Sequence, residues 1–254
     1  MSRGALGAWR VVVSFAVFVG VWQLAWILSA YPDSLFPSPA ESVSALLDLA
    51  SGGRLAGDVA ASLFRYVVGF SLAAVSGVLL GLLLGWFSRA WSYVNPVVQF
   101  VRPISPMAWL PFMVLLLGIG DVPAIAIVFI AAFFPVLIGT VSAVRSIDPI
   151  FLKVARNFGV SGPRKMLTVV FPAVLPHVMN ALRTAIGTAW IFLVAGEMVG
   201  AQTGLGYLII DARNSIRADQ LLAAIIAIGL IGFVLDTVAR ALDARVRRSW
   251  GREV

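Results

Sequence analysis

The chain has 254 residues, of which 60% are hydrophobic and only 12% charged, with no cysteine and a formal net charge of +7. Because an average soluble domain is roughly 25% charged, this composition excludes a water-soluble globular protein. The lack of cysteine excludes a disulfide framework and a thiolate metal site. The basic residues do not cluster on one polar helix or among exposed aromatic residues, which argues against a nucleic-acid partner.

The N-terminal apolar run, Val11 to Ala30, follows two arginines, Arg3 and Arg10. Its length of about 20 residues exceeds the roughly 7 to 15 of a signal-peptide core and suffices to span a bilayer. We therefore predict a cytoplasmic N-terminus at 1–10 and a retained first transmembrane helix at 11–30. Five further spans pass the same length test, at 66–86, 94–119, 122–144, 172–199 and 221–239. The predicted fold is an all-α polytopic membrane protein with six transmembrane helices.

The orientation follows from the charges that flank these spans. The segments 1–10, 87–93, 145–171 and 240–254 carry 13 Lys and Arg residues and 3 acidic residues. The segments 31–65, 120–121 and 200–220 carry 4 basic and 7 acidic residues. By the positive-inside rule the first set is cytoplasmic. We therefore predict that both termini and the long loop 145–171 lie inside, with a basic cytoplasmic tail at 240–254.

Two helical patterns occur before the third span. Within the periplasmic segment 31–65, residues 41–50 place apolar side chains at helical spacing, which predicts a helix lying at the membrane surface. In the second span, small residues recur every four positions and form a strip that lets another helix approach closely. This strip consists of Gly69, Ala73, Gly77, Gly81 and Gly85.

The third span contains three prolines within nine residues, Pro103, Pro106 and Pro111. Each removes a backbone donor, so the helix must kink or break near membrane depth. The freed carbonyls are tolerated only against protein or a water-lined cavity. Two interpretations remain open here, a packing kink or a segment that lines the solute path or its gate.

The inner loop 145–171 encodes one short helix. Asp148 followed by Pro149 is typical of a helix start, and Gly159 is a natural stop. Ser161 offers a second N-cap. Four apolar residues occupy positions i, i+3, i+4 and i+7 of this helix, while Lys153 and Arg156 point elsewhere. The apolar stripe consists of Phe151, Val154, Ala155 and Phe158. Such a helix can lie on the lipid surface or dock into a groove of a partner protein.

The run Leu152 to Ser161, followed by Pro172 and Pro176, resembles the EAA loop of type I ABC importer permeases. The glutamate of the family motif is Lys153 here and its first alanine is Val154. The resemblance implies a coupling helix that sits in a cleft of the ATPase subunit. The implied contact residues are Phe151, Lys153, Val154, Ala155, Arg156, Phe158, Gly159 and Ser161.

The resemblance extends over about residues 60–245. The sequences Ala108-Trp109-Leu110-Pro111, Ala181-Leu182-Arg183, Ala189-Trp190 and Gly196-Glu197-Met198 are similar to the nitrate, sulfonate, taurine and bicarbonate branch of these permeases. It implies a bacterial inner-membrane homodimer, two cytoplasmic ATPase subunits, and a periplasmic or lipid-anchored solute-binding protein. The chain has no G-x-x-x-x-G-K-[ST] loop, so ATP and Mg are expected on the ATPase, with no cofactor here.

The path for a small anion is expected between two copies, since six helices offer too little wall to enclose a polar solute. The candidate path or gate residues are Arg102, Met107, Trp109, Pro111, Arg183, Trp190, Glu197 and Met198. Two of these, Arg102 and Arg183, either contact the anion or form structural ion pairs, such as Arg183 with Asp236 or Glu197. The only histidine, His177, is expected to pack as a polar residue. The alternative function is a channel or secondary transporter without an ATPase.

Overall fold

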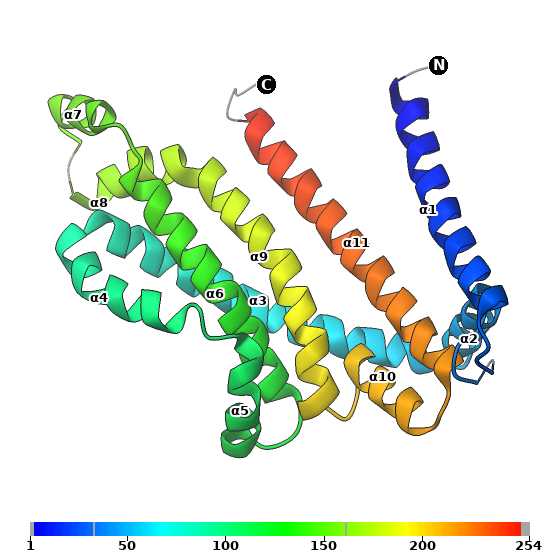
Figure 1. Cartoon of the computed structure of the whole chain (residues 1–254). Helices are drawn as coiled ribbons and strands as arrows, with labels where there is room; N and C mark the ends of the chain where they lie inside the picture. The colour runs from blue at the N-terminus through cyan, green and yellow to red at the C-terminus, as the bar shows by residue number, and fades with distance from the viewer. Residues whose placement is uncertain (1–2, 33, 161, 250–254) are drawn as a thin grey trace.

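A computed structural model of the chain describes residues 3–32, 34–160 and 162–249, and every regular element within these ranges is a helix (Figure 1). The helices are α1 (Arg3–Leu28), α2 (Pro39–Ser51), α3 (Arg54–Trp86), α4 (Ser88–Val101), η1 (Pro106–Trp109), α5 (Leu110–Leu117), α6 (Asp121–Arg145), α7 (Pro149–Asn157), α8 (Gly162–Lys165), the π-helix η2 (Met166–Val170), α9 (Phe171–Gly200), α10 (Leu205–Asn214) and α11 (Ala218–Ser249).

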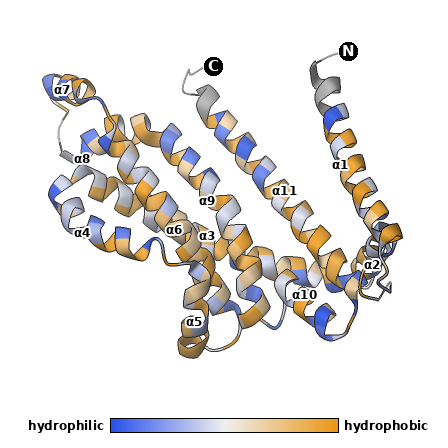
Figure 2. Ribbon diagram, in the orientation of Figure 1, coloured by the Kyte–Doolittle hydropathy of each residue, from blue (hydrophilic) through white to orange (hydrophobic). Residues whose placement is uncertain are grey.

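Five helices are long and apolar enough to cross a membrane, namely α1, α3, α6, the η2–α9 unit and α11. The bent pair made by α4 and the η1–α5 unit supplies a sixth span if it is counted as one. Apolar residues predominate along these helices, as Figure 2 shows. The predicted all-α membrane fold is therefore confirmed, with five candidate spans, or six if the bent pair crosses as one.

The third predicted span, 94–119, is wrong as a single helix. The helix α4 ends at Val101, and η1 and α5 continue after a bend of 83°. The break falls between Arg102 and Pro106, where the sequence is rich in proline, so the predicted interruption is confirmed. Its cause is local, because proline can neither donate to the preceding turn nor avoid a clash with it.

The segment 31–65 holds more helix than the sequence indicated. The helix α2 begins at a capping box in which the Ser38 hydroxyl accepts from the Glu41 amide and the Glu41 carboxylate accepts from the Ser38 amide. The next helix, α3, begins at Arg54 rather than at residue 66, so it carries three extra turns into the segment 31–65. These turns bury the polar residues Asp58, Ser62 and Arg65.

The small-residue strip of α3 faces α6, as predicted. A Cβ atom on Gly69 would lie 2.8 Å from the Val128 Cβ, and one on Gly81 would lie 2.5 Å from the Thr140 Cβ. Any side chain at these positions would force the two helices apart. The strip therefore serves helix packing and places α3 against α6 along most of its length.

The core is formed where α3, α6, α9 and α11 meet. Tyr66 stacks edge-on against Trp190 with 5.6 Å between ring centroids, and its hydroxyl donates to the Ile186 carbonyl at 3.1 Å. The Trp190 indole N–H donates to the Ile228 carbonyl at 3.2 Å. These bonds satisfy both polar ring atoms, so two large aromatic residues are accommodated within an apolar bundle.

The bundle has two distinct ends (Figure 1). The start of α1, the end of α11 and the helix α7 lie at one end, whereas α5 and α10 lie at the other. The 25 residues of α6 separate Asp121 at the second end from Arg145 at the first. At 1.5 Å per residue this separation is about 37 Å, enough to cross a membrane.

Candidate functional site

The helix α7 is formed as the sequence predicts. The Asp148 carboxylate accepts a hydrogen bond from the Ile150 amide at 2.8 Å, and Pro149 occupies the first turn. The helix ends at Asn157, and Gly159 follows with φ of 73°, a left-handed conformation that glycine adopts without strain. Both ends are therefore fixed by local chemistry, whatever the helix contacts. Ser161, predicted as a second cap and coupling residue, lies outside the described residues.

The apolar stripe of α7 divides into two faces. Phe151, Val154 and Phe158 are 60%, 47% and 82% exposed, whereas Ala155 is buried against the chain itself. Ala155 lies on the same side of the helix as Leu152, which packs into the cluster of α9 and α6, and its contact with an ATPase stays a prediction. Lys153, Arg156 and Gly159 are exposed. Three large exposed apolar side chains on a short helix are typical of a surface that binds a partner protein or lipid.

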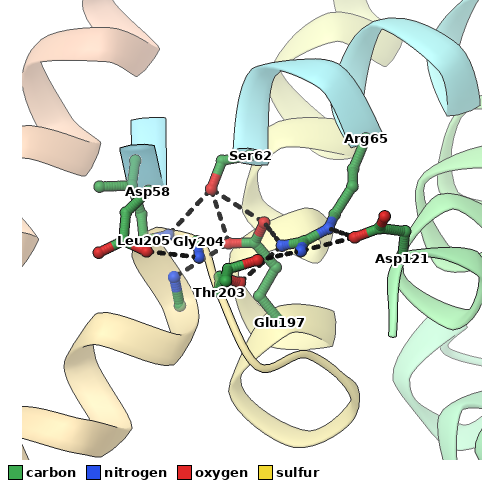
Figure 3. A network of polar contacts seen from close by, with 9 residues as sticks. Asp58, Ser62, Arg65, Asp121, Glu197, Thr203, Gly204 and Leu205 are labelled. Atoms are coloured by element: carbon green, nitrogen blue, oxygen red, sulfur yellow. Dashed lines mark hydrogen bonds and ion pairs between the residues drawn. The ribbon is translucent and has the colours of Figure 1, made fainter. Parts of the chain in front are cut away.

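A buried polar network occupies the opposite end of the bundle (Figure 3). The Arg65 guanidinium, 2% exposed, donates to the Glu197 carboxylate at 2.7 Å and to Asp121 Oδ1 at 2.7 Å. Glu197 is fully buried, and it also accepts from the Ser62 hydroxyl at 2.8 Å and from the Gly206 amide at 3.0 Å. This network ties α3, α6 and α9 together at one level.

The same network fixes the turn between α9 and α10. Arg65 also donates to the Thr203 carbonyl and hydroxyl, both at 2.6 Å, and Asp58 accepts from the Gly204 amide at 2.8 Å. A Cβ atom on Gly204, whose φ is 105°, would lie 2.5 Å from the Glu197 carboxylate. Only glycine lets the turn approach the buried ion pair so closely. The loop that caps this end of the bundle is therefore anchored through α3.

The predicted ion pairs are wrong. Glu197 pairs with Arg65, Asp236 pairs with Arg240 at 2.7 Å, and the Arg183 guanidinium lies 3.9 Å from Asp243. The sequence did hold a signal for the first pair. Asp58, Ser62 and Arg65 share one face of a helix at i, i+4 and i+7. The predicted second span begins only at residue 66, so the prediction does not include this face.

Four of the predicted path residues lie at the break of the third span. Arg102 follows α4 and is exposed, and it forms no ion pair within the described part of the chain. Met107 and Trp109, both half-buried, form η1, while Pro111 in the first turn of α5 is exposed. The structure thus gathers these residues in one place, at a site where the helix cannot continue.

The remaining predicted path residues are dispersed. Trp190 is 5% exposed in the core, and Glu197 is fully enclosed by the network. The polar atoms of both side chains are hydrogen-bonded to other residues of the same bundle. Met198 is partly exposed near the end of α9. Arg183 is half-buried, and its guanidinium is directed toward α11.

His177 was expected to pack, but the structure leaves it exposed at a hollow between α6 and α9. Its exposure follows from helix rotation, because the buried side of this turn is taken by Val174 and Val178. Among residues 3–32, 34–160 and 162–249, no group of three His, Asp or Glu side chains could hold a metal ion. The polar groups of the hollow are therefore considered as hydrogen-bonding groups.

The chain thus combines five or six candidate spans with a broken third span and a short amphipathic helix between α6 and α9. The family model of the binding-protein-dependent transport system inner membrane component matches residues 77–248. The chain belongs to this family. It is a multi-pass inner-membrane permease subunit of an ABC importer, a class that works with ATPase and binding-protein partners.

Relatives with known names are also import permeases. The nitrate import permease protein NrtB of Synechocystis sp. is 33% identical, with 93% of this chain and 88% of that protein covered. The taurine transport system permease protein TauC of Escherichia coli is 30% identical, with 95% and 89% covered. A structure of the MetNI methionine ABC transporter in inward facing conformations contains a chain of the same fold, with a TM-score of 0.58 and 20% identity, covering 74% and 95%.

Proposed function

We propose that two copies of this chain form the path for a small oxyanion, such as a sulfonate or nitrate, delivered by an external binding protein. Two ATPase subunits would supply the energy by docking on α7 of each copy. The observation that carries this proposal is the exposed apolar face of α7, made by Phe151, Val154 and Phe158 at one end of a membrane-spanning bundle.

Two features support an oxyanion. The relatives named for their solute transport nitrate and taurine, and taurine is a sulfonate. The arginine at the break of the third span, Arg102, is exposed and lacks an ion-pair partner in the described ranges. A guanidinium offers a planar set of donors that suits a sulfonate, nitrate or carboxylate. The methionine transporter shares the fold alone and says nothing of this solute.

Uptake by the reconstituted complex tests this function. We expect vesicles that contain this chain, its ATPase and its loaded binding protein to accumulate taurine or nitrate only when ATP is supplied on the ATPase side. A complex lacking the ATPase should accumulate neither. Accumulation without the ATPase would instead identify a secondary transporter or channel.

We also propose that both termini and α7 are cytoplasmic. The flanking charges favour this orientation, and the structure puts the start of α1, the end of α11 and α7 at one end of the bundle (Figure 1).

The absence of cysteine makes this orientation directly testable. Single cysteines at Ser34 and Ser215, both exposed at the far end, should react with a membrane-impermeant thiol reagent added to intact cells. Cysteines at Ser161 and Ser249 should react only after the membrane is opened. Labelling of a cysteine at Ser161 from outside intact cells would show that the orientation is the opposite of the proposed one.

A further inference from the structure

A polar hollow of about 300 Å³ lies between α6 and α9. It includes Ser142 and Ser146 on α6 and His177, Asn180 and Thr184 on α9. Along α9, His177 and Thr184 are 6 and 13 residues after Phe171, which places them about 9 and 20 Å into the helix. The hollow therefore lies within the candidate span Met166–Gly200, in the half of the bundle nearer to α7.

The floor of the hollow is formed by backbone. A Cβ atom on Gly139 would lie 2.5 Å from the Ala181 Cβ, so α6 and α9 come very close there. The polar side chains stand on either side of this contact, since 177, 180 and 184 share one face of α9 and 142 and 146 share one face of α6. At roughly 30 Å³ per water molecule, the volume accommodates a small solute with part of its hydration shell.

The polar groups are not equally satisfied. The Ser146 and Thr184 hydroxyls donate to carbonyls of their own helices, at Ala143 and Asn180. The Asn180 amide and the His177 imidazole form no hydrogen bond within the described part of the chain, and both side chains are exposed. Within the hydrocarbon core of a membrane, an unpaired amide that faces lipid is strongly unfavourable. Water or a polar solute must therefore reach these two groups.

The chemistry of the lining favours an anion. No carboxylate is among the lining residues, while the two N–H groups of an asparagine amide can donate to a negatively charged oxygen. These donors are neutral, so they would hold an anion weakly enough to release it, which a path requires.

We propose that this hollow is a subsite for the transported oxyanion, in which Asn180 and His177 contact the solute before it leaves toward the α7 side. The inference rests on the proposed function, and it adds to Arg102 two contact residues that sequence reasoning did not place on the path. It predicts that the hollow is filled by water and solute rather than by a lipid chain or a side chain of the second copy.

Cysteine accessibility in the assembled complex tests whether water and solute fill the hollow between α6 and α9. A cysteine at Thr184 should react with an anionic, water-soluble thiosulfonate, and taurine or nitrate, whichever the complex imports, should slow the reaction. The matched control is a cysteine at Ser76 in the middle of the predicted span 66–86, which also donates to a carbonyl of its own helix, at Leu72. It should remain unreactive in lipid. An unreactive cysteine at Thr184, or a rate unaffected by the imported solute, would overturn the proposal.

Substitution of Asn180 separates solute contact from a structural role. Asn180→Asp keeps the size of the side chain but places a negative charge against the solute, so uptake should fall by about ten-fold or more. Asn180→Ser keeps a donor and should retain more uptake than the aspartate variant. In both variants the ATPase should still co-purify with the chain.

Failure of this inference and failure of the proposed function give different results. If the unsubstituted complex imports an oxyanion and the Asn180→Asp complex imports it equally well, the subsite is wrong and the function stands. If the unsubstituted complex imports neither taurine nor nitrate, both proposals fall.

Discussion

A Val154→Asp substitution should detach the ATPase or abolish its coupling to uptake. Val154 is nearly half-exposed between Phe151 and Phe158 on the outer face of α7, so the bare chain tolerates a charge there. In an apolar groove of a partner the same carboxylate would be desolvated without a counter-charge, which costs several kcal/mol by order of magnitude. We expect a loss of at least about ten-fold in ATPase retention, measured by co-purification in detergent.

The matched control uses the same position. Val154→Leu keeps an apolar side chain and should retain the ATPase, and membrane levels of both variants should equal those of the unsubstituted chain. If Val154→Asp still holds the ATPase and supports uptake at the parental rate, α7 is not the docking element. Its apolar face would then be assigned to the lipid surface.

Removal of the Arg65 side chain should unfold this end of the bundle. Arg65→Met leaves the Glu197 carboxylate fully buried without its counter-charge, and it releases Asp121 and the Thr203 carbonyl as well. Breaking a buried pair from one side costs about 3–5 kcal/mol. We expect a marked drop in the thermal unfolding midpoint of the purified complex, or loss of the chain from the membrane.

Two variants distinguish the buried charge from a general effect of losing an arginine. Arg240→Met breaks the Arg240–Asp236 pair, in which both side chains are nearly half-exposed, and should cost no more than about 1 kcal/mol. Adding Glu197→Gln to Arg65→Met removes the unpaired charge and should restore part of the lost stability. Equal unfolding midpoints for Arg65→Met and Arg240→Met would show that the network does not stabilise the fold.

Local features of this protein were determined by the sequence alone. The number of spans follows from the length of apolar runs, and the break in the third span follows from its prolines. The bounds of α7 follow from Asp148, Pro149 and Gly159. The strip from Gly69 to Gly85 indicated close helix packing before its partner was known. Each of these conclusions depends on residues that are close together in the sequence.

The tertiary structure decided which charged residues pair with one another and how each helix is rotated about its axis. Arg65 meets Glu197 across 132 residues of sequence, and nothing local distinguishes that pairing from the predicted one with Arg183. A helix that is apolar on every side has no polar face to fix its rotation. Only packing could therefore bury Trp190 and Glu197 while leaving His177 and Asn180 open. On α7, packing likewise decided which part of the apolar stripe is covered, since Ala155 is buried while Phe151 and Phe158 are exposed.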